Sequence, residues 1–193
     1  AQAVAPAHLG RQAALVGLCA GLLPDADAII SSSADPLLQL EYHRHFTHAL
    51  VFVPFGSLIV SLFCWKLFKH GLNFKEVYLF CFLGYATHGL LDACTTYGTL
   101  LLWPFSDTRF AWNNISIIDP LLTLPMLTFV ILSITRKTNF FSRVAVIWVV
   151  LYLTVGLIQR ERAIEAGYEI ASSRAHQPTR LEAKPSFGNI LLW

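Results

Sequence analysis

The chain has 193 residues, of which 55% are hydrophobic and only 13% are charged. Soluble domains carry about 25% charged residues, so the composition argues against a disordered chain and against an ordinary soluble enzyme. The net charge of +2 is too small to indicate a nucleic-acid-binding surface, and we therefore expect a membrane protein that binds no nucleic acid.

Five apolar stretches are candidates for membrane helices. About 20 apolar residues cross the hydrocarbon core as a helix. The three clearest candidates are Ala49–Phe68, Ile117–Thr135 and Asn139–Ile158. Val77–Leu91 is long enough only for a short or tilted span, and Ala13–Leu23 is shorter still. The pattern predicts an all-α, polytopic membrane protein with about four main spans in the lipid bilayer.

Basic residues give these spans an orientation. Lysines follow the first clear span, and further basic residues separate the last two; they are Lys66, Lys69, Lys75, Arg136, Lys137 and Arg143. Because basic loops stay on the cytoplasmic side, both loops are expected to face the cytoplasm. Counting spans outward then predicts that Asp25, the segments 41–48 and 92–116, and the tail after Gln159 reach the outer face.

Charged residues become frequent after residue 159. We expect a helical membrane domain over residues 1–159 and a short extramembrane appendage over residues 160–193. Within the appendage, Arg160–Arg174 is expected to form a polar helix on the membrane surface, and Ser186–Trp193 a short strand.

Two polar clusters precede the first clear span. In LLPDAD, the carboxylates of Asp25 and Asp27 stand one residue apart at an expected helix end, as metal ligands or as solvated acids of a helix terminus. In YHRHFTH, three imidazoles occur within six residues, at His43, His45 and His48. An interfacial polar belt is the alternative there, but three histidines beside hydrocarbon favour a set of metal ligands.

Further clusters lie in and after the next apolar stretch. His88 and Asp92 are four residues apart, so in a helix both side chains point to one side. That spacing can ligate one metal or let the acid orient the imidazole. Arg109 could bind an anion such as phosphate or contact a lipid headgroup. Asp119 begins a span, where an acid could serve a site or only complement the helix dipole.

The expected topology brings all these clusters to the same face of the membrane. Imidazole and carboxylate together suit Zn²⁺, Mn²⁺ or Fe²⁺, and such a cluster can activate water for hydrolysis. The sequence contains no G-x-S-x-G elbow, P-loop or Rossmann glycine fingerprint, so serine-hydrolase and nucleotide-cofactor chemistry lack motif support.

In this order, the clusters resemble the LexA-regulated family of bacterial inner-membrane, metal-dependent hydrolases. The resemblance rests on LLPDADAI, YHRHFTHAL, ATHGLLDACTTYGTLLLWPF, SDTRFAW and SIIDPL. It covers most of the chain from about Gly10 to about Pro125, and PSFGNILLW resembles the family's periplasmic appendage. The usual family beginning, with Thr-His or Thr-Gln near the first residues, does not precede Ala1, so we expect the natural start and a further candidate ligand to lie upstream.

The resemblance implies an integral protein of the bacterial inner membrane with its metal site and appendage on the periplasmic side. Carried over residue by residue, the implied metal-site positions are Asp25, Asp27, His43, His48, His88, Asp92 and Asp119. His45 falls where family members commonly have another residue. Arg44 and Arg109 match recurrent basic positions and would suit an anionic substrate.

The resulting hypothesis is a membrane-bound metal-dependent hydrolase. Metal-activated water would attack an ester or phosphoester of a lipid-like substrate at the outer interface. The ligands expected for a divalent ion, Zn²⁺ or Mn²⁺, are His43, His48, His88 and Asp92. The acids expected as further ligands or as the general base are Asp25, Asp27 and Asp119. Arg44 or Arg109 would stabilise the developing negative charge.

Two other interpretations stay open, so enzyme activity itself is not decided by the sequence. One is a non-catalytic membrane protein that binds or transports a metal ion. A transporter needs polar groups through the depth of the core, whereas Ala49–Phe68 and Asn139–Ile158 offer hydroxyls but no mid-span acid or histidine. In the other interpretation, the metal only fastens helices together.

Overall fold

The computed structural model describes residues 1–32, 34–35, 37–68 and 71–193. Over these residues the chain forms α- and 3₁₀-helices with one isolated β-bridge, between Thr99 and Phe110. The predicted all-α class is confirmed. The α-helices are α1 (Gly10–Leu22), α2 (Leu38–Tyr42), α3 (Val53–Phe68), α4 (Phe74–Ala93), α5 (Pro120–Thr135) and α6 (Phe140–Ser173). Lys69, one of the basic residues used for the topology, lies outside the described residues.

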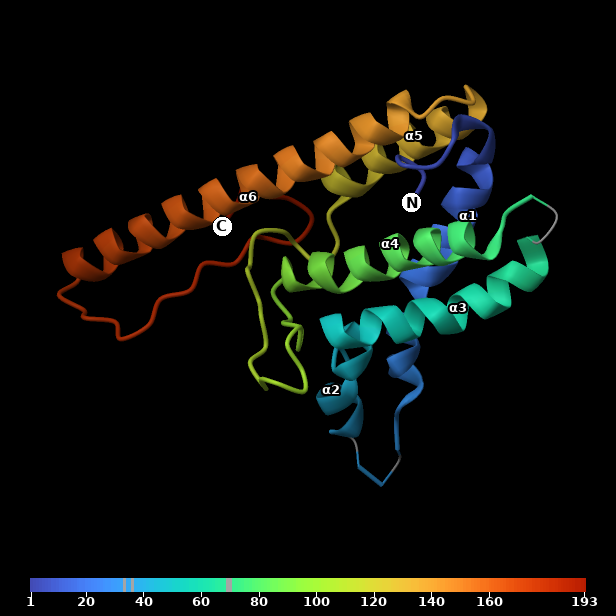
Figure 1. Cartoon of the computed structure of the whole chain (residues 1–193). Coiled ribbons are helices and arrows are strands. Elements are labelled where there is room, and N and C mark those ends of the chain that lie inside the picture. Colours follow the sequence, from blue (N-terminus) through green and yellow to red (C-terminus); the bar gives the residue numbers. More distant parts are fainter. Residues whose placement is uncertain (33, 36, 69–70) are drawn as a thin grey trace.

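The α-helices pack in two units (Figure 1). In the first, α4 packs against both α1 and α3, and in the second α5 packs along α6. Three 3₁₀ turns connect the end of α1 to the start of α3; they are η2 (Pro24–Ile29), η3 (Phe46–His48) and η4 (Leu50–Phe52). Because α4 runs antiparallel to α3, the last turn of α4 reaches the same end of the first unit.

The starts of α4 and α5 are fixed by side chains that satisfy the first backbone N–H groups. Asn73 and Glu76 form a capping box at α4, in which each side chain accepts a hydrogen bond from the backbone N–H of the other. The Asp119 carboxylate accepts hydrogen bonds from the N–H groups of Leu121 and Leu122 at the start of α5. These caps fix the residues at which α4 and α5 begin.

α1 and α4 cross at a contact made by glycines. A Cβ atom on Gly84 of α4 would overlap the carbonyl oxygen of Gly17 in α1. One turn further along α1, a Cβ atom on Gly21 would lie at an ordinary 3.5 Å from the carbonyl oxygen of Gly84. Small residues four positions apart let membrane helices approach closely, and at this crossing position 84 has room only for glycine.

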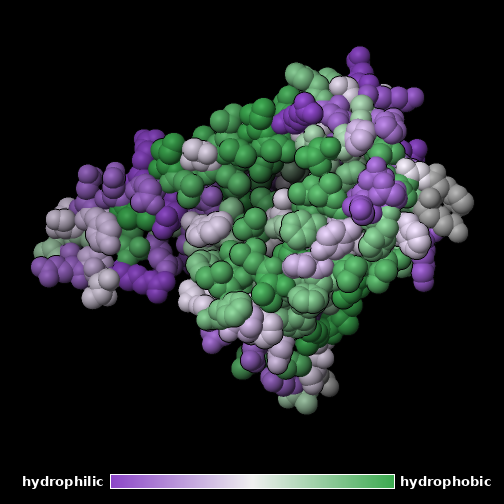
Figure 2. Space-filling view, viewed as in Figure 1, coloured by the Kyte–Doolittle hydropathy of each residue, from purple (hydrophilic) through white to green (hydrophobic). Residues whose placement is uncertain are grey.

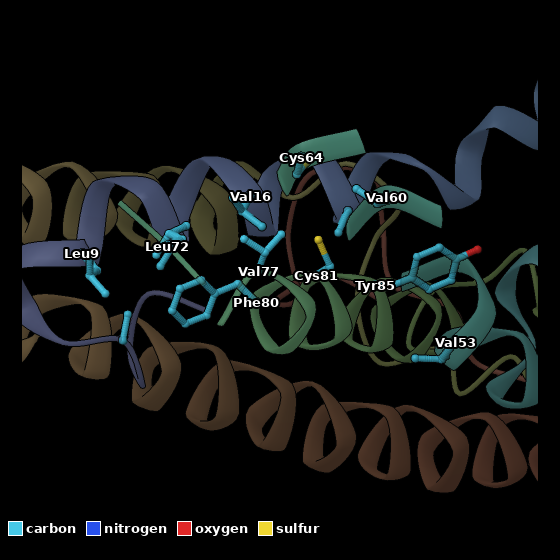
Figure 3. Packing of buried hydrophobic residues seen from close by; sticks show 13 residues of the cluster. Leu9, Val16, Val53, Val60, Cys64, Leu72, Val77, Phe80, Cys81 and Tyr85 are labelled. Atoms are coloured by element: carbon cyan, nitrogen blue, oxygen red, sulfur yellow. The ribbon is translucent and has the colours of Figure 1, made fainter. Parts of the chain in front are cut away.

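The main apolar core lies between α1, α3 and α4 (Figure 3). Side chains such as Val16, Val60, Val77 and Phe80 meet there. Tyr85 lies at one end of the cluster with only 1% of its surface exposed, and its hydroxyl points away from the other labelled side chains. Between membrane helices, such a side chain stabilises the structure by van der Waals packing rather than by leaving water. The packing therefore anchors the end of the core that faces the 3₁₀ turns.

Three helical stretches of the described chain are long and apolar enough to cross a membrane: Ala7–Ile29, Leu50–Phe68 and Phe140–Ser173. The predicted spans at 49–68 and 139–158 each begin one residue before one of these stretches and otherwise lie inside it. α5 has 16 residues, fewer than the predicted Ile117–Thr135 span, because the helix starts only after the Asp119 cap. Figure 2 shows hydrophobic residues over the middle of the molecule and hydrophilic ones near the far end of α6.

α6 runs without interruption over 34 residues. The predicted boundary between residues 159 and 160 therefore falls inside a helix, and the polar stretch from Arg160 continues the apolar one in the same direction (Figure 1). After α6 the chain turns back toward the start of α5.

The predicted short strand at Ser186–Trp193 is wrong, since the segment contains a turn at 187–188 and a bend at 190–191 but no strand. A strand needs a partner for its backbone hydrogen bonds. The segment instead closes on itself, because the Asn189 side chain accepts hydrogen bonds from the N–H groups of Leu191 and Leu192. Of the apolar residues in this segment, Ile190 is buried and packs in one cluster with Leu122 of α5.

The glycine crossing gives a direct test of the α1–α4 packing. We expect Gly84→Ala to lower the free energy of unfolding by about 1–3 kcal/mol, because the new methyl group forces the two helices apart. Gly21→Ala, on the facing helix, is the matched control and should be neutral or slightly stabilising, since its methyl group has room. Thermal unfolding of both variants in the same detergent measures the difference. Equal stability of the two variants would contradict the close crossing.

Candidate metal centre

Three segments far apart in the sequence bring polar side chains to one end of the first unit. η2 carries Asp25 and Asp27 directly after α1, and residues 43–48 precede α3. His88 and Asp92 lie in the last turns of α4, one helical turn apart on the same side. The predicted meeting of these clusters is thus seen in the geometry.

The two acids of η2 lie in different surroundings. Asp27 is 2% exposed, whereas the side chain of Asp25 is half exposed. Pro24 begins the 3₁₀ turn, in which residues two positions apart point in directions about 120° from one another. Asp27 is therefore enclosed by protein, and Asp25 stands at the rim of the site.

One group of four side chains has the spacing of a metal coordination shell. The two Nε2 atoms of His48 and His88 are 3.1 Å apart, and Asp92 Oδ2 lies 3.1 Å from the first and 3.4 Å from the second. Asp25 Oδ1 lies 3.6 Å and 3.3 Å from the same two nitrogens. Ligands of a tetrahedral Zn²⁺, bonded at about 2.0–2.1 Å, lie roughly 3.3 Å from one another. The four groups therefore fit around one ion.

The chemistry of these atoms also fits a cation. Asp92 Oδ2 is buried and faces both imidazole nitrogens, at 3.1 Å and 3.4 Å. Two nitrogens that approach to 3.1 Å need a proton or a cation between them, because two lone pairs repel. Two imidazoles with two carboxylates are a donor set that zinc and manganese accept.

The opposite edge of the His48 ring is held by Asp27 and Thr47. His48 Nδ1 lies 3.0 Å from Thr47 Oγ1 and 3.3 Å from Asp27 Oδ2, and the Thr47 hydroxyl donates to the same carboxylate oxygen at 2.8 Å. A carboxylate on this side favours the tautomer with its proton on Nδ1. The lone pair of Nε2 then points toward His88 and Asp92.

The pKa of His48 reflects these neighbours. Burial, the largest influence, lowers the pKa of the imidazole, but hydrogen bonds to Asp27 and Asp92 and the charges of both carboxylates outweigh it. The pKa of His48 therefore lies above its ordinary value in the protein without a bound cation. A metal ion at Nε2 has to compete with this proton.

His43 belongs to a second, neighbouring group. Its Nδ1 lies 2.9 Å from Asp27 Oδ1, and its side chain is 28% exposed. One ring nitrogen of His43 and carboxylate oxygens of Asp25 and Asp27 lie within 4.8 Å of one another. The sequence grouped His43 with the other histidine ligands, whereas the structure places Asp25 in the four-residue group and His43 beside Asp27.

Contacts that the sequence analysis did not identify position His48 against α4. A Cβ atom on Gly89 would lie 2.7 Å from the carbonyl oxygen of His48, so only glycine allows this approach. The Tyr85 hydroxyl donates to the carbonyl oxygen of Thr47 at 2.7 Å, and its ring packs over Gly56 of α3. In the sequence, only the glycines at positions 89 and 56 could have indicated these close contacts.

Both arginines that were expected to bind an anion contact the protein itself. Arg44 Nε lies 3.1 Å from Asp92 Oδ2, and its Nη1 donates to the Thr95 hydroxyl at 2.7 Å. Arg109 donates to the backbone carbonyl oxygens of Glu41 and His43. Arg44 thus supports a carboxylate of the four-residue group, and Arg109 fixes the backbone at the rim.

Asp119 lies in neither group. Its carboxylate caps α5, and the Tyr152 hydroxyl of α6 lies 2.8 Å and 2.9 Å from its two oxygens. The side chain is buried, and its carboxylate oxygens accept hydrogen bonds from these partners. Asp119 therefore links α5 to α6. These contacts agree with the alternative that the sequence left open, in which Asp119 acts only at the helix terminus.

This difference between Asp119 and the clustered acids can be measured. Asp119→Ala should cost about 1–2 kcal/mol of stability through loss of the cap, and it should leave the affinity of the protein for Zn²⁺ unchanged. Tyr152→Phe is the milder control, since it removes only the hydroxyl. Isothermal titration with Zn²⁺ and thermal unfolding of each variant separate the two effects. A lower zinc affinity of Asp119→Ala would contradict this assignment and indicate that Asp119 contributes to the metal centre.

Comparison with known proteins is consistent with a membrane location. The chain is similar to the inner membrane protein YbcI of Escherichia coli (strain K12), with 34% identity over 105 residues. The match covers 52% of this chain and 60% of that protein, so the chain spans about three fifths of the relative's length. No solved structure matches the chain.

The family model described as YdjM inner membrane protein matches residues 1–163. These residues include every side chain of the two groups described above. They also include the motifs on which the predicted resemblance was based, and that resemblance is confirmed. The chain belongs to the YdjM family of inner membrane proteins.

Proposed function

We propose that the protein is a membrane-bound metal-dependent hydrolase whose divalent cation, Zn²⁺ or Mn²⁺, is held by Asp25, His48, His88 and Asp92. The observation that carries the proposal is the mutual spacing of their ligand atoms, 3.1–3.6 Å for the five pairs that include an imidazole nitrogen. That spacing matches the edges of a tetrahedral shell. A cation held there would supply Lewis acidity for the hydrolysis of an ester or phosphoester.

The protein's own residues prepare this shell. Asp27 and Thr47 hold the His48 ring from its far side, which keeps Nε2 directed at the ion. Arg44 holds the Asp92 carboxylate through its Nε atom. Partners of this kind typically change metal affinity 10–100-fold when they are removed.

Exposure supports a catalytic rather than a closed structural site. Asp25 is half exposed while the other three ligands are mostly buried, so the shell opens on one side. Structural zinc sites have four protein ligands and catalytic sites keep one position for water or substrate, so activity here requires the exposed Asp25 to give way or the shell to expand. The weakly enclosed Asp25 is the ligand that a substrate oxygen could replace or join.

The position of the opening supports a lipid-like substrate. The site lies at the end of helices whose outward surfaces are apolar (Figure 2), where lipid headgroups gather. Exposed apolar side chains, Ile29 and Leu40, flank the segments that carry the ligands. An ester or phosphoester near a lipid headgroup would reach the site without leaving the interface.

We further propose that the site faces the periplasm. The described basic residues Lys66, Lys75 and Arg143 lie near helix ends opposite to the metal site, at the end of α3 and the starts of α4 and α6. Basic ends stay in the cytoplasm.

A structural metal site is the second candidate, and one observation favours it. The four ligands come from three segments, so a bound ion would also link η2 and η3 to α4. Such a link raises stability whether or not the protein has activity. Only turnover distinguishes the two functions.

The proposal is tested with purified protein in detergent. We expect one Zn²⁺ to bind per chain, and hydrolysis of a generic phosphodiester or a generic ester to stop with a strong chelator and return with added Zn²⁺. His88→Ala should lose both the ion and turnover. His45→Ala is the matched control and should keep both, because His45 contacts Trp103 and lies outside both groups.

Two results would count against this proposal. Turnover that persists in the chelator would exclude the metal mechanism. Zinc that binds and stabilises the protein without any turnover would favour the structural metal site.

Zinc affinity should also depend on pH. Because the pKa of His48 is raised, its imidazole is protonated over a wider range of pH, and Zn²⁺ must displace that proton. For one displaced proton, affinity falls about tenfold for each unit of pH below the pKa. Zinc titrations between about pH 5.5 and 8 measure the slope. An affinity that is independent of pH over this range would exclude His48 as a ligand.

A further inference from the structure

The His43–Asp27 pair lies beside the four-residue group but is not needed to complete it. His43 Nδ1 is 2.9 Å from Asp27 Oδ1, a hydrogen-bond distance. Asp27 is buried, whereas His43 is partly exposed at the rim. A buried carboxylate hydrogen-bonded to one nitrogen of a partly exposed imidazole is the arrangement in which histidine accepts and returns protons.

We propose that His43 is the general base of this site and that Asp27 is the residue that positions it. The inference rests on the proposed hydrolase function and deepens it. Asp27 fixes the proton of neutral His43 on Nδ1, leaves the lone pair on Nε2, and stabilises the imidazolium that forms when Nε2 takes up a proton.

The location of His43 suits this role. One of its ring nitrogens lies within 4.8 Å of an Asp25 carboxylate oxygen. The His43 ring also meets the His48 ring edge to face, with 6.3 Å between centroids, which places it next to the metal ligands without joining them.

The backbone holds His43 in this place. The next residue, Arg44, has a left-handed backbone with φ of 58°, and its N–H donates to Asp27 Oδ2 at 3.0 Å. A non-glycine residue in this conformation costs roughly 1–2 kcal/mol, so surrounding contacts must maintain it. Arg109 donates to the His43 carbonyl oxygen, and the His43 ring packs against Tyr97.

The same three residues could instead hold a second cation, and the contacts of Asp27 argue against it. Its Oδ1 faces His43 Nδ1, while Oδ2 accepts hydrogen bonds from the Arg44 N–H and the Thr47 hydroxyl. Carboxylate oxygens that already accept protein donors have few lone pairs left for an ion. Asp27 is therefore better described as the partner of two histidines, His43 and His48.

In this step His43 carries one proton from the attacking water to the leaving group. A proton passes from the attacking water to His43 Nε2, and the water oxygen forms a bond to the phosphorus or carbonyl carbon of the substrate. The bond from that atom to the leaving oxygen breaks, and the leaving oxygen receives the proton back from His43. No oxidant or other reactant is needed.

The test compares two substitutions of His43 with the ligand variant His88→Ala. In His43→Asn, the amide nitrogen replaces Nδ1 as the donor to Asp27, but no atom can accept a proton at the Nε2 position. We expect His43→Asn and His43→Ala to retain one Zn²⁺ per chain by elemental analysis. Turnover of the phosphodiester or ester probe should fall about 10²–10⁴-fold in both.

Chemical rescue separates proton transfer from a structural role. Added imidazole should restore part of the turnover of His43→Ala, which leaves space for it, and none in His88→Ala, which lacks the ion. Thermal unfolding in the absence of zinc checks that the variants are folded. His45→Ala, two residues away, should keep its zinc and its turnover.

Different results would overturn different claims. Loss of the single zinc in His43→Asn would make His43 a ligand, and two zinc ions in the unaltered chain with one in the variant would mean a second cation. Unchanged turnover in His43→Asn would remove this inference and leave the hydrolase proposal intact. An unaltered chain that binds zinc but hydrolyses neither probe would remove both.

Discussion

The candidate metal centre depends on how closely the backbone at His48 approaches α4. Gly89 leaves no side chain between them, and Tyr85 ties the preceding carbonyl group to the core. This contact brings the Nε2 atoms of His48 and His88 to 3.1 Å from one another. A side chain at position 89 would move a metal ligand away from its partner, although position 89 itself carries no functional group.

A second close contact sets the position of the acids. The glycine crossing of α1 and α4 places the end of α1, and therefore η2, beside the last turns of α4. Asp25 and Asp27 of η2 then reach the two histidines. The helices of the first unit thus act as a rigid support, and short 3₁₀ turns present the chemistry, which is a common division between scaffold and site.

Burial divides the roles of the polar residues. Asp27 and His48 are enclosed by protein, where charges interact strongly and water is scarce. Asp25 and His43 stand at the rim, where water and a substrate can reach them. The same enclosed carboxylate touches both His48 and His43, so it connects the ligand side of the site to the side where we propose proton transfer.

Much of this arrangement could be predicted from the sequence. The i, i+4 spacing of His88 and Asp92 puts both on one side of a helix, and the apolar stretches with their basic ends bring the remaining clusters to the same face. The sequence could not show that His48 is placed as a metal ligand while His43 pairs with Asp27. This difference depends on the left-handed turn at Arg44, which a sequence of non-glycine residues does not indicate.

Other features depend on contacts over long distances in the sequence. The role of Asp119 is set by Tyr152, which is 33 residues away on α6. The turns at 186–193 form because Ile190 finds a buried place beside Leu122, not because of any local strand propensity. Local patterns could not show which partner each residue would meet.

X-ray absorption at the zinc edge of the zinc-loaded protein tests the central claim most directly. The account predicts two imidazole nitrogens and two oxygens as the protein ligands, at about 2.0–2.1 Å, with any further ligand an oxygen from solvent. A shell that contains sulfur at about 2.3 Å, or one without imidazole, would contradict it.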